Sequence, residues 1–170
     1  MINEALQKAI NQQIVREFYS ANLYLAMSAH FERESLKGFA NWMRVQYQEE
    51  NFHALKFFDY LLDRGGSAEL GAISAPPQKW DSPLHAFEDA LHHEQLVTNW
   101  INEIADLALQ HRDHALLSLL NWFVDEQVEE ESTANEMVDR LKLVGDNKAA
   151  LFMMDNEMKA RVYTPPAAAK

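Results

Sequence analysis

The sequence contains no cysteine, and this absence excludes several kinds of site at once. A disulfide framework, a zinc–thiolate site and an iron–sulfur cluster all require cysteine sulfur. Glycine and proline are also scarce, at five residues each, and most of them lie between long stretches with helical periodicity. The chain therefore predicts few breaks in its helices, and a metal bound to it must be held by oxygen and nitrogen atoms.

Positive charge and long apolar runs are lacking as well. Lys and Arg number 15 against 26 Asp and Glu, which gives a net charge of −11, so nucleic acid is not an expected partner. No run approaches the ~18 apolar residues of a membrane span, and the start MINEALQKAI has no signal-peptide pattern. These features predict a cytoplasmic protein with no membrane or nucleic-acid partner.

Hydrophobic periodicity predicts an all-α fold with four long helices and a short fifth helix. The predicted helices span residues 3–34, 38–64, 83–110, 114–144 and 146–162. The connection GGSAELGAISAPPQKWD, after the second helix, can reach along a whole helix, so helices two and three should run parallel. Residues 1–163 form the predicted domain, and residues 164–170 form a predicted flexible tail.

Each long predicted helix carries a polar interruption near the middle of its apolar stripe. The interruptions are Glu17, then Glu50 and His53, then Glu94, and finally Gln127 and Glu130. Because they lie at similar depths in their helices, they should meet at one level of the bundle. An offset of 77 residues maps Glu17 onto Glu94 and Glu50 onto Gln127, which is typical of two related helical hairpins.

Carboxylates buried together need a counter-charge, because each isolated buried ion costs several kcal/mol and like charges add to that cost. Few basic residues share these stripes, so divalent cations are the favoured counter-charge. Glu50 and His53, three positions apart, can reach one ion together. Carboxylates with one imidazole suit iron or manganese, and zinc less strictly, so the pattern predicts a dimetal site. The alternative is a loose bundle with partly solvated polar residues.

On these residues, the chain resembles a bacterial non-haem ferritin of the ferritin-like di-iron carboxylate family along essentially its whole length. The resemblance implies a ferritin-like four-helix bundle with a long crossover and a short fifth helix. It also implies a homo-oligomeric cage of 24 subunits that stores iron as a ferric oxide mineral. Its activity would be that of a ferroxidase, in which dioxygen or hydrogen peroxide oxidises Fe(II) to Fe(III) at a di-iron centre inside each subunit.

The resemblance implies five ligands for the two irons, all of them among the polar interruptions described above. Glu17 and His53 would bind the first iron and Glu50 would bridge both. Glu94 and Glu130 would bind the second iron. The position after the bridging residue, where a bacterioferritin has a haem-ligating Met, is Asn51 here, so haem is not expected.

Further roles follow from the same resemblance. Gln127 would lie beside the two irons and hydrogen-bond a ligand or water, and Tyr24 is a candidate electron donor. Glu49, Glu126 and Glu129, sharing one ligand of the second iron, match a third iron site that is typical of the bacterial group. For the neighbouring pair His92-His93, a surface or packing role is favoured, since adjacent helical residues point about 100° apart.

Two rival functions stay open. A soluble dimetal oxidase or peroxidase would use the same centre without storing a mineral, although rubrerythrin-like peroxidases usually add a four-cysteine module that this chain lacks. A purely structural helical bundle would have no redox role. The small twelve-subunit relatives lack the fifth helix predicted at residues 146–162, which argues against that assembly.

Overall fold

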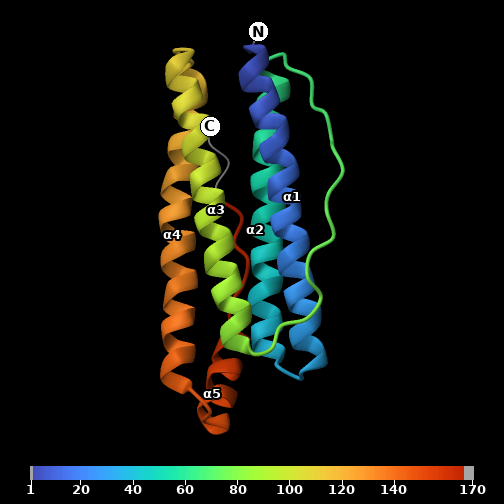
Figure 1. The fold of residues 1–170 in the computed structure, drawn as a ribbon, viewed down its shortest axis with the longest axis vertical. Helices are drawn as coiled ribbons and strands as arrows, with labels where there is room; N and C mark the ends of the chain where they lie inside the picture. Colours follow the sequence, from blue (N-terminus) through green and yellow to red (C-terminus); the bar gives the residue numbers. More distant parts are fainter. Residues whose placement is uncertain (1, 167–170) are drawn as a thin grey trace.

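The computed structural model describes residues 2–166, which form five α-helices and contain no strand (Figure 1). The helices are α1 (Glu4–Arg33), α2 (Lys37–Asp63), α3 (Pro83–Gln110), α4 (His114–Val144) and α5 (Lys148–Met158). The all-α prediction is confirmed, and the ends of the four long helices lie within one residue of their predicted positions. Of the predicted flexible tail, residues 167–170 lie outside the described part.

The long connection between α2 and α3 runs along the whole bundle, beside α1 (Figure 1). As a result α2 and α3 point in the same direction, as predicted, while α1–α2 and α3–α4 are antiparallel hairpins. The fifth helix closes one end of the bundle and packs mainly against α2. Within residues 2–166, no helix has both the length and the apolar character needed to cross a membrane.

Most helices begin with a side chain that accepts a hydrogen bond from the first turn. Asn3, Ser82, Asp113 and Asn147 play this part for α1, α3, α4 and α5. The second helix has no such residue at its own start. Instead, the Asp155 carboxylate of α5 accepts the backbone N–H groups of Gly38 at 2.7 Å and Phe39 at 3.1 Å.

This contact requires a glycine at the start of α2. A Cβ at Gly38 would lie 1.6 Å from the backbone oxygen of Asp155, far inside van der Waals contact. The fifth helix is shorter than predicted, at Lys148–Met158 instead of 146–162. It begins later because Asn147 caps it, and the same region near Gly38 explains why it ends earlier. Asn41 of α2 donates to the carbonyl oxygens of Met158 and Arg161. These two hydrogen bonds hold the segment after Met158 in a turn that does not continue the helix.

A band of polar side chains divides the interior of the bundle into two apolar halves. One half contains Phe31, Phe39 and Phe87 near α5, and the other contains Phe57 and Phe123 near the opposite end. The buried polar residues of the band are Gln13, Glu17, Ser20, Gln46, Glu50, His53, His93, Glu94, Gln127 and Glu130. The four polar interruptions of the sequence therefore do meet at one level, inside the protein.

Candidate metal centre

The first group of candidate ligands comes from the α1–α2 hairpin. Glu17, Glu50 and His53 are all buried, and one ligand atom from each lies within 4.8 Å of the others. The Nδ1 atom of His53 is 3.6 Å from Oε2 of Glu50. Glu50 and His53 lie three residues apart and therefore share one face of α2. Glu17 reaches them from α1, the antiparallel neighbour of α2. A single cation can be bound by all three side chains.

Two oxygen atoms in this group lack any hydrogen-bond partner among residues 2–166. Oε2 of Glu17 and Oε2 of Glu50 are both buried and both unpaired, whereas Oε1 of Glu17 accepts a 2.8 Å hydrogen bond from Gln13 Nε2. Buried polar atoms are almost always paired in folded proteins, because an unpaired one costs about 1–3 kcal/mol. An arrangement that leaves two carboxylate oxygens free beside an imidazole fits a bound cation well.

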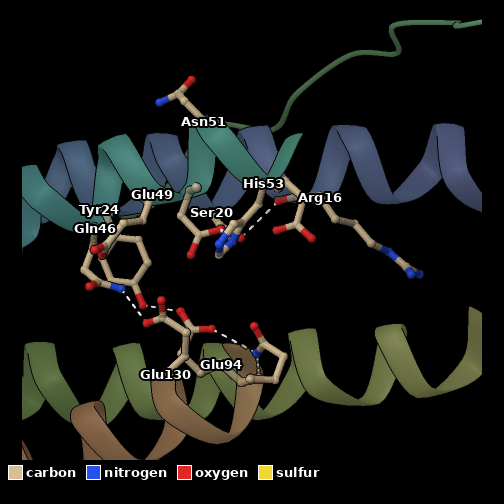
Figure 2. A network of polar contacts seen from close by, with 12 residues as sticks. Arg16, Ser20, Tyr24, Gln46, Glu49, Asn51, His53, Glu94 and Glu130 are labelled. Carbon is tan, nitrogen blue, oxygen red and sulfur yellow. Dashed lines mark hydrogen bonds and ion pairs between the residues drawn. The ribbon is translucent and has the colours of Figure 1, made fainter. Parts of the chain in front are cut away.

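The α3–α4 hairpin supplies Glu94 and Glu130, which face the first group across the bundle (Figure 2). Oε1 of Glu94 accepts a hydrogen bond from the Tyr24 hydroxyl, and Oε2 accepts one of 3.2 Å from Gln127 Nε2. Oε2 of Glu130 accepts one of 2.8 Å from Gln46 Nε2. Each carboxylate is therefore held in place by a neutral donor, which orients it without neutralising its charge.

A second group overlaps the first. One ligand atom each of His53, Glu126 and Glu130 lies within 4.8 Å of the others. The imidazole thus lies between the two groups. Glu94 belongs to neither of these close groups, and its two oxygens accept the hydrogen bonds from Tyr24 and Gln127.

Burial and mutual repulsion change the acid–base properties of these side chains. Burial raises the pKa of Glu17 to about 7, and burial together with the neighbouring carboxylates raises the pKa of Glu50 and Glu130 well above the usual range. Burial also raises the pKa of Glu94 and lowers that of His53 to about 4. The imidazole is therefore neutral at pH 7 and free to bind a metal, while carboxyl groups still protonated must release protons when a cation binds.

The three residues predicted for a further iron site are less enclosed. Glu49 is partly buried and accepts a 2.9 Å ion-pair hydrogen bond from Arg161, while Glu126 is half-buried and Glu129 is exposed. Burial raises the pKa of Glu49, Arg161 opposes this, and the charges of Glu126 and Glu129 add to the increase. Burial, followed by the charge of Glu129, raises the pKa of Glu126. These carboxylates form an acidic edge beside the buried groups.

The remaining sequence-predicted residues are found as follows. Tyr24 is fully buried, and burial raises its pKa well above the usual value, so the phenol keeps its proton. His92 is exposed, which agrees with a surface role. His93 is buried and forms a hydrogen bond of 2.8 Å with Ser20, which agrees with a packing role. Asn51 points away from the buried carboxylates (Figure 2) and donates to a backbone carbonyl of its own helix.

Three residues at the site were not predicted to take part. Gln13 and Gln46 hold Glu17 and Glu130, and their helical positions on the same buried faces could have indicated this role. Arg161 contacts Glu49 across 112 residues of sequence. No local pattern connects those two positions, so only the folded chain reveals the contact.

Comparisons with known proteins agree with this architecture. Residues 7–144 match the family model described as a ferritin-like domain. A bacterial non-heme ferritin of Bacteroides fragilis is 45% identical over 161 residues, covering 95% of this chain and all of that protein. A bacterial non-heme ferritin of Staphylococcus aureus is 41% identical over 163 residues, covering 96% of this chain and 98% of that one. The solved structure of an open-pore ferritin from Archaeoglobus fulgidus has a TM-score of 0.94 and 48% identity, covering 95% of this chain and all of that one.

Proposed function

Because this chain belongs to the ferritin family, we propose that it stores iron by oxidising Fe(II) at the buried centre and depositing the Fe(III) as a ferric oxide mineral. The iron is thus substrate and cargo. The proposed container is a homo-oligomeric cage of 24 subunits in the cytoplasm, formed by the domain of residues 1–163, with residues 164–170 as a flexible tail. The similarity to an open-pore ferritin structure over nearly the whole chain supports self-assembly.

The proposed ligands divide between the two helical hairpins. Glu17 and His53 bind the first Fe(II), Glu94 and Glu130 bind the second, and Glu50 bridges them. A bridging role for Glu50 is supported by its unpaired Oε2 and by its closeness to carboxylates of both hairpins, since the charges of Glu94, Glu17 and Glu130 all raise its pKa after burial does. The ligand set contains no thiolate and no second imidazole, which favours iron over softer ions.

The reaction balances with two electrons and two protons. Two Fe(II) ions lose one electron each, and dioxygen with two protons becomes hydrogen peroxide; if hydrogen peroxide is the oxidant, two water molecules form. Carboxyl groups such as Glu17, whose pKa burial raises to about 7, release protons when Fe(II) binds. Gln127 positions Glu94 and an adjacent water. Tyr24 is the proposed electron donor: an electron that it lends to the centre is returned to it by a further Fe(II) ion, so the overall balance is unchanged. The protein contributes geometry, negative charge and exclusion of bulk water.

The oxidised ions need a way out of the centre. Fe(III) is a harder and more highly charged ion than Fe(II), and it hydrolyses to an oxide. Glu49, Glu126 and Glu129, with Glu130, form the proposed third iron site on the acidic edge next to the centre. The proposed function includes no haem.

One observation carries the proposal, namely that Glu17 and Glu50 each have a buried, unpaired oxygen and form one close group with His53, which burial keeps neutral. The test is the rate of Fe(II) oxidation under air in Glu50→Ala and His53→Ala. Both variants should be slowed by more than about 100-fold, since even changes behind the ligands of metal sites cost 10- to 100-fold. His92→Ala, an exposed histidine, is the matched control and should oxidise Fe(II) like the unmodified protein. Unchanged fast oxidation in both Glu50→Ala and His53→Ala would remove the centre from the mechanism.

The rival functions give different results in two further measurements. A dimetal oxidase without storage would be a small oligomer that retains no mineral, whereas a storage protein should be a hollow particle whose mass rises on iron loading. A structural bundle would retain no iron after purification and dialysis. Native mass measurement with and without iron separates all three.

A further inference from the structure

The chain after α5 folds back onto α2 and is bound there by side chains. Asn41 Nδ2 donates to the carbonyl oxygen of Met158 at 3.1 Å and to that of Arg161 at 2.9 Å. The guanidinium of Arg161 lies 4.5 Å from the centre of the Trp42 ring, close enough for a cation–π contact. Arg161 is thus held at two points: Asn41 holds its backbone carbonyl, and Trp42 contacts its guanidinium.

The guanidinium of Arg161 reaches the acidic edge of the metal centre. Nη2 donates to Oε2 of Glu49 at 2.9 Å and also to Oε1 of Gln46. The amide of Gln46 in turn donates to Oε2 of Glu130 at 2.8 Å. Arg161 therefore contacts one proposed ligand of the third iron directly and is connected to a second one through a single side chain.

The charges at this edge are unevenly paired. Within residues 2–166, Glu49 has an ion pair, with Arg161, whereas Glu126 and Glu129 have none. The Arg161 guanidinium already occupies the oxygen of Glu49 that a metal ion would need. An Fe(II) ion bound by Glu49 would compete for the same carboxylate and would repel the guanidinium.

We propose that Arg161 is a built-in counter-ion of the third iron site, which occupies Glu49 until Fe(II) displaces it. The inference rests on the proposed function, because it takes Glu49, Glu126, Glu129 and Glu130 to be the ligands of that iron. About a quarter of each side chain in the Arg161–Glu49 pair is exposed, so the pair can open into water. The third site then fills after the first two, and its occupation removes one of the contacts that hold Arg161 against α2, which loosens the turn at residues 159–161 while the hydrogen bonds from Asn41 remain.

The first test is anaerobic Fe(II) titration calorimetry of the full-length protein. Arg161→Gln should bind the third Fe(II) about fivefold more tightly, the upper range for loss of a competing, partly exposed ion pair. The first two Fe(II) ions should bind as before. Arg140→Gln is the matched control, because this substitution removes the same charge from an arginine that is paired with the exposed Glu157, at 2.6 Å, and not with Glu49.

The second test follows the chain itself by hydrogen exchange. The amides of Ala160 and Arg161 are hydrogen-bonded to the carbonyls of Glu157 and Met158, both at 3.2 Å. Adding a third equivalent of Fe(II) without oxygen should speed their exchange in the unmodified protein. In Glu49→Gln, which lacks the contested carboxylate, the third equivalent should leave their exchange unchanged.

The outcomes separate this inference from the proposed function. Equal or weaker third-site affinity in Arg161→Gln relative to Arg140→Gln would overturn the inference, as would a third Fe(II) that binds with no change in exchange at Arg161. Absence of any third binding step would overturn it too. Failure of the first two Fe(II) ions to bind the unmodified protein would instead overturn the proposed function.

Discussion

Replacing Glu17 by Gln tests whether the buried, ionised carboxylates destabilise the folded protein when no metal is bound. Glu17 is 1% exposed, and burial raises its pKa from 4.5 to about 7. A raised pKa means that the folded state prefers the protonated group. The stability associated with that proton is fully present below pH 4.5, the unfolded value, and is lost as pH rises through about 7.

The size of the effect follows from the two pKa values. Each tenfold change in a protonation equilibrium is worth about 1.4 kcal/mol, so moving the pKa from 4.5 to about 7 corresponds to roughly 3 kcal/mol. Gln keeps the shape of the side chain and an oxygen for the hydrogen bond from Gln13, but it carries no charge. At pH 8 without metal, Glu17→Gln should therefore be more stable than the unmodified protein by roughly 3 kcal/mol.

The assay is urea unfolding followed by circular dichroism, with chelator, at pH 4.5 and pH 8. One subunit concentration must be used throughout, because the apparent stability of an assembly depends on it. At pH 4.5 the two proteins should be nearly equal. Adding redox-inert Zn²⁺ at pH 8 should reverse the order, because the unmodified protein gains binding energy from a ligand that the variant lacks. Glu136→Gln, an exposed position on α4, is the matched control and should shift little at either pH.

The reasoning would be refuted if metal-free Glu17→Gln were less stable than the unmodified protein at pH 8. A stability difference of the same size at both pH values would also refute it, since the effect would then not depend on ionisation. Failure of Zn²⁺ to favour the unmodified protein would show that the carboxylate does not bind the ion.

Two further predictions concern the end of the bundle and the phenol beside the centre. Gly38→Ala should lower the free energy of unfolding by about 1–3 kcal/mol or detach α5, because its Cβ would collide with the backbone of Asp155. The control is Gly71→Ala, whose Cβ would meet Val15 at an ordinary 3.5 Å. In the same urea assay this control should have almost no effect. Tyr24→Phe removes the hydroxyl that donates to Glu94 and the proposed electron donor, so calorimetry should still find two Fe(II) sites while stopped-flow absorbance shows slower turnover. Unchanged oxidation kinetics would exclude Tyr24 as a donor.

Much of the fold could be predicted because its signals are local. Apolar periodicity, the caps at Asn3 and Ser82, and the glycines after α2 determine where the long helices begin and end. The polar band could be predicted for the same reason, since a charged residue on an apolar helical face is visible in the sequence. The parallel arrangement of α2 and α3 followed from the length of one connection.

The features that could not be predicted depend on contacts between distant parts of the chain. The second helix is capped by Asp155, 117 residues after Gly38, and α5 ends early because Asn41 donates to the carbonyls of Met158 and Arg161. The contact of Arg161 with Glu49 is likewise a contact between distant parts of the chain. The metal-ligand residues themselves came from the periodic pattern, and their individual roles from the family resemblance, so those roles stay predictions.

The central claim is that carboxylates from separate helices lie together in the core because cations neutralise them. Anomalous diffraction at the iron edge, from crystals soaked anaerobically in a ferrous salt, tests it most directly. Two iron peaks are predicted, one contacting Glu17, Glu50 and His53, the other contacting Glu50, Glu94 and Glu130. The claim would be contradicted by side chains that gather as described with no anomalous density between them.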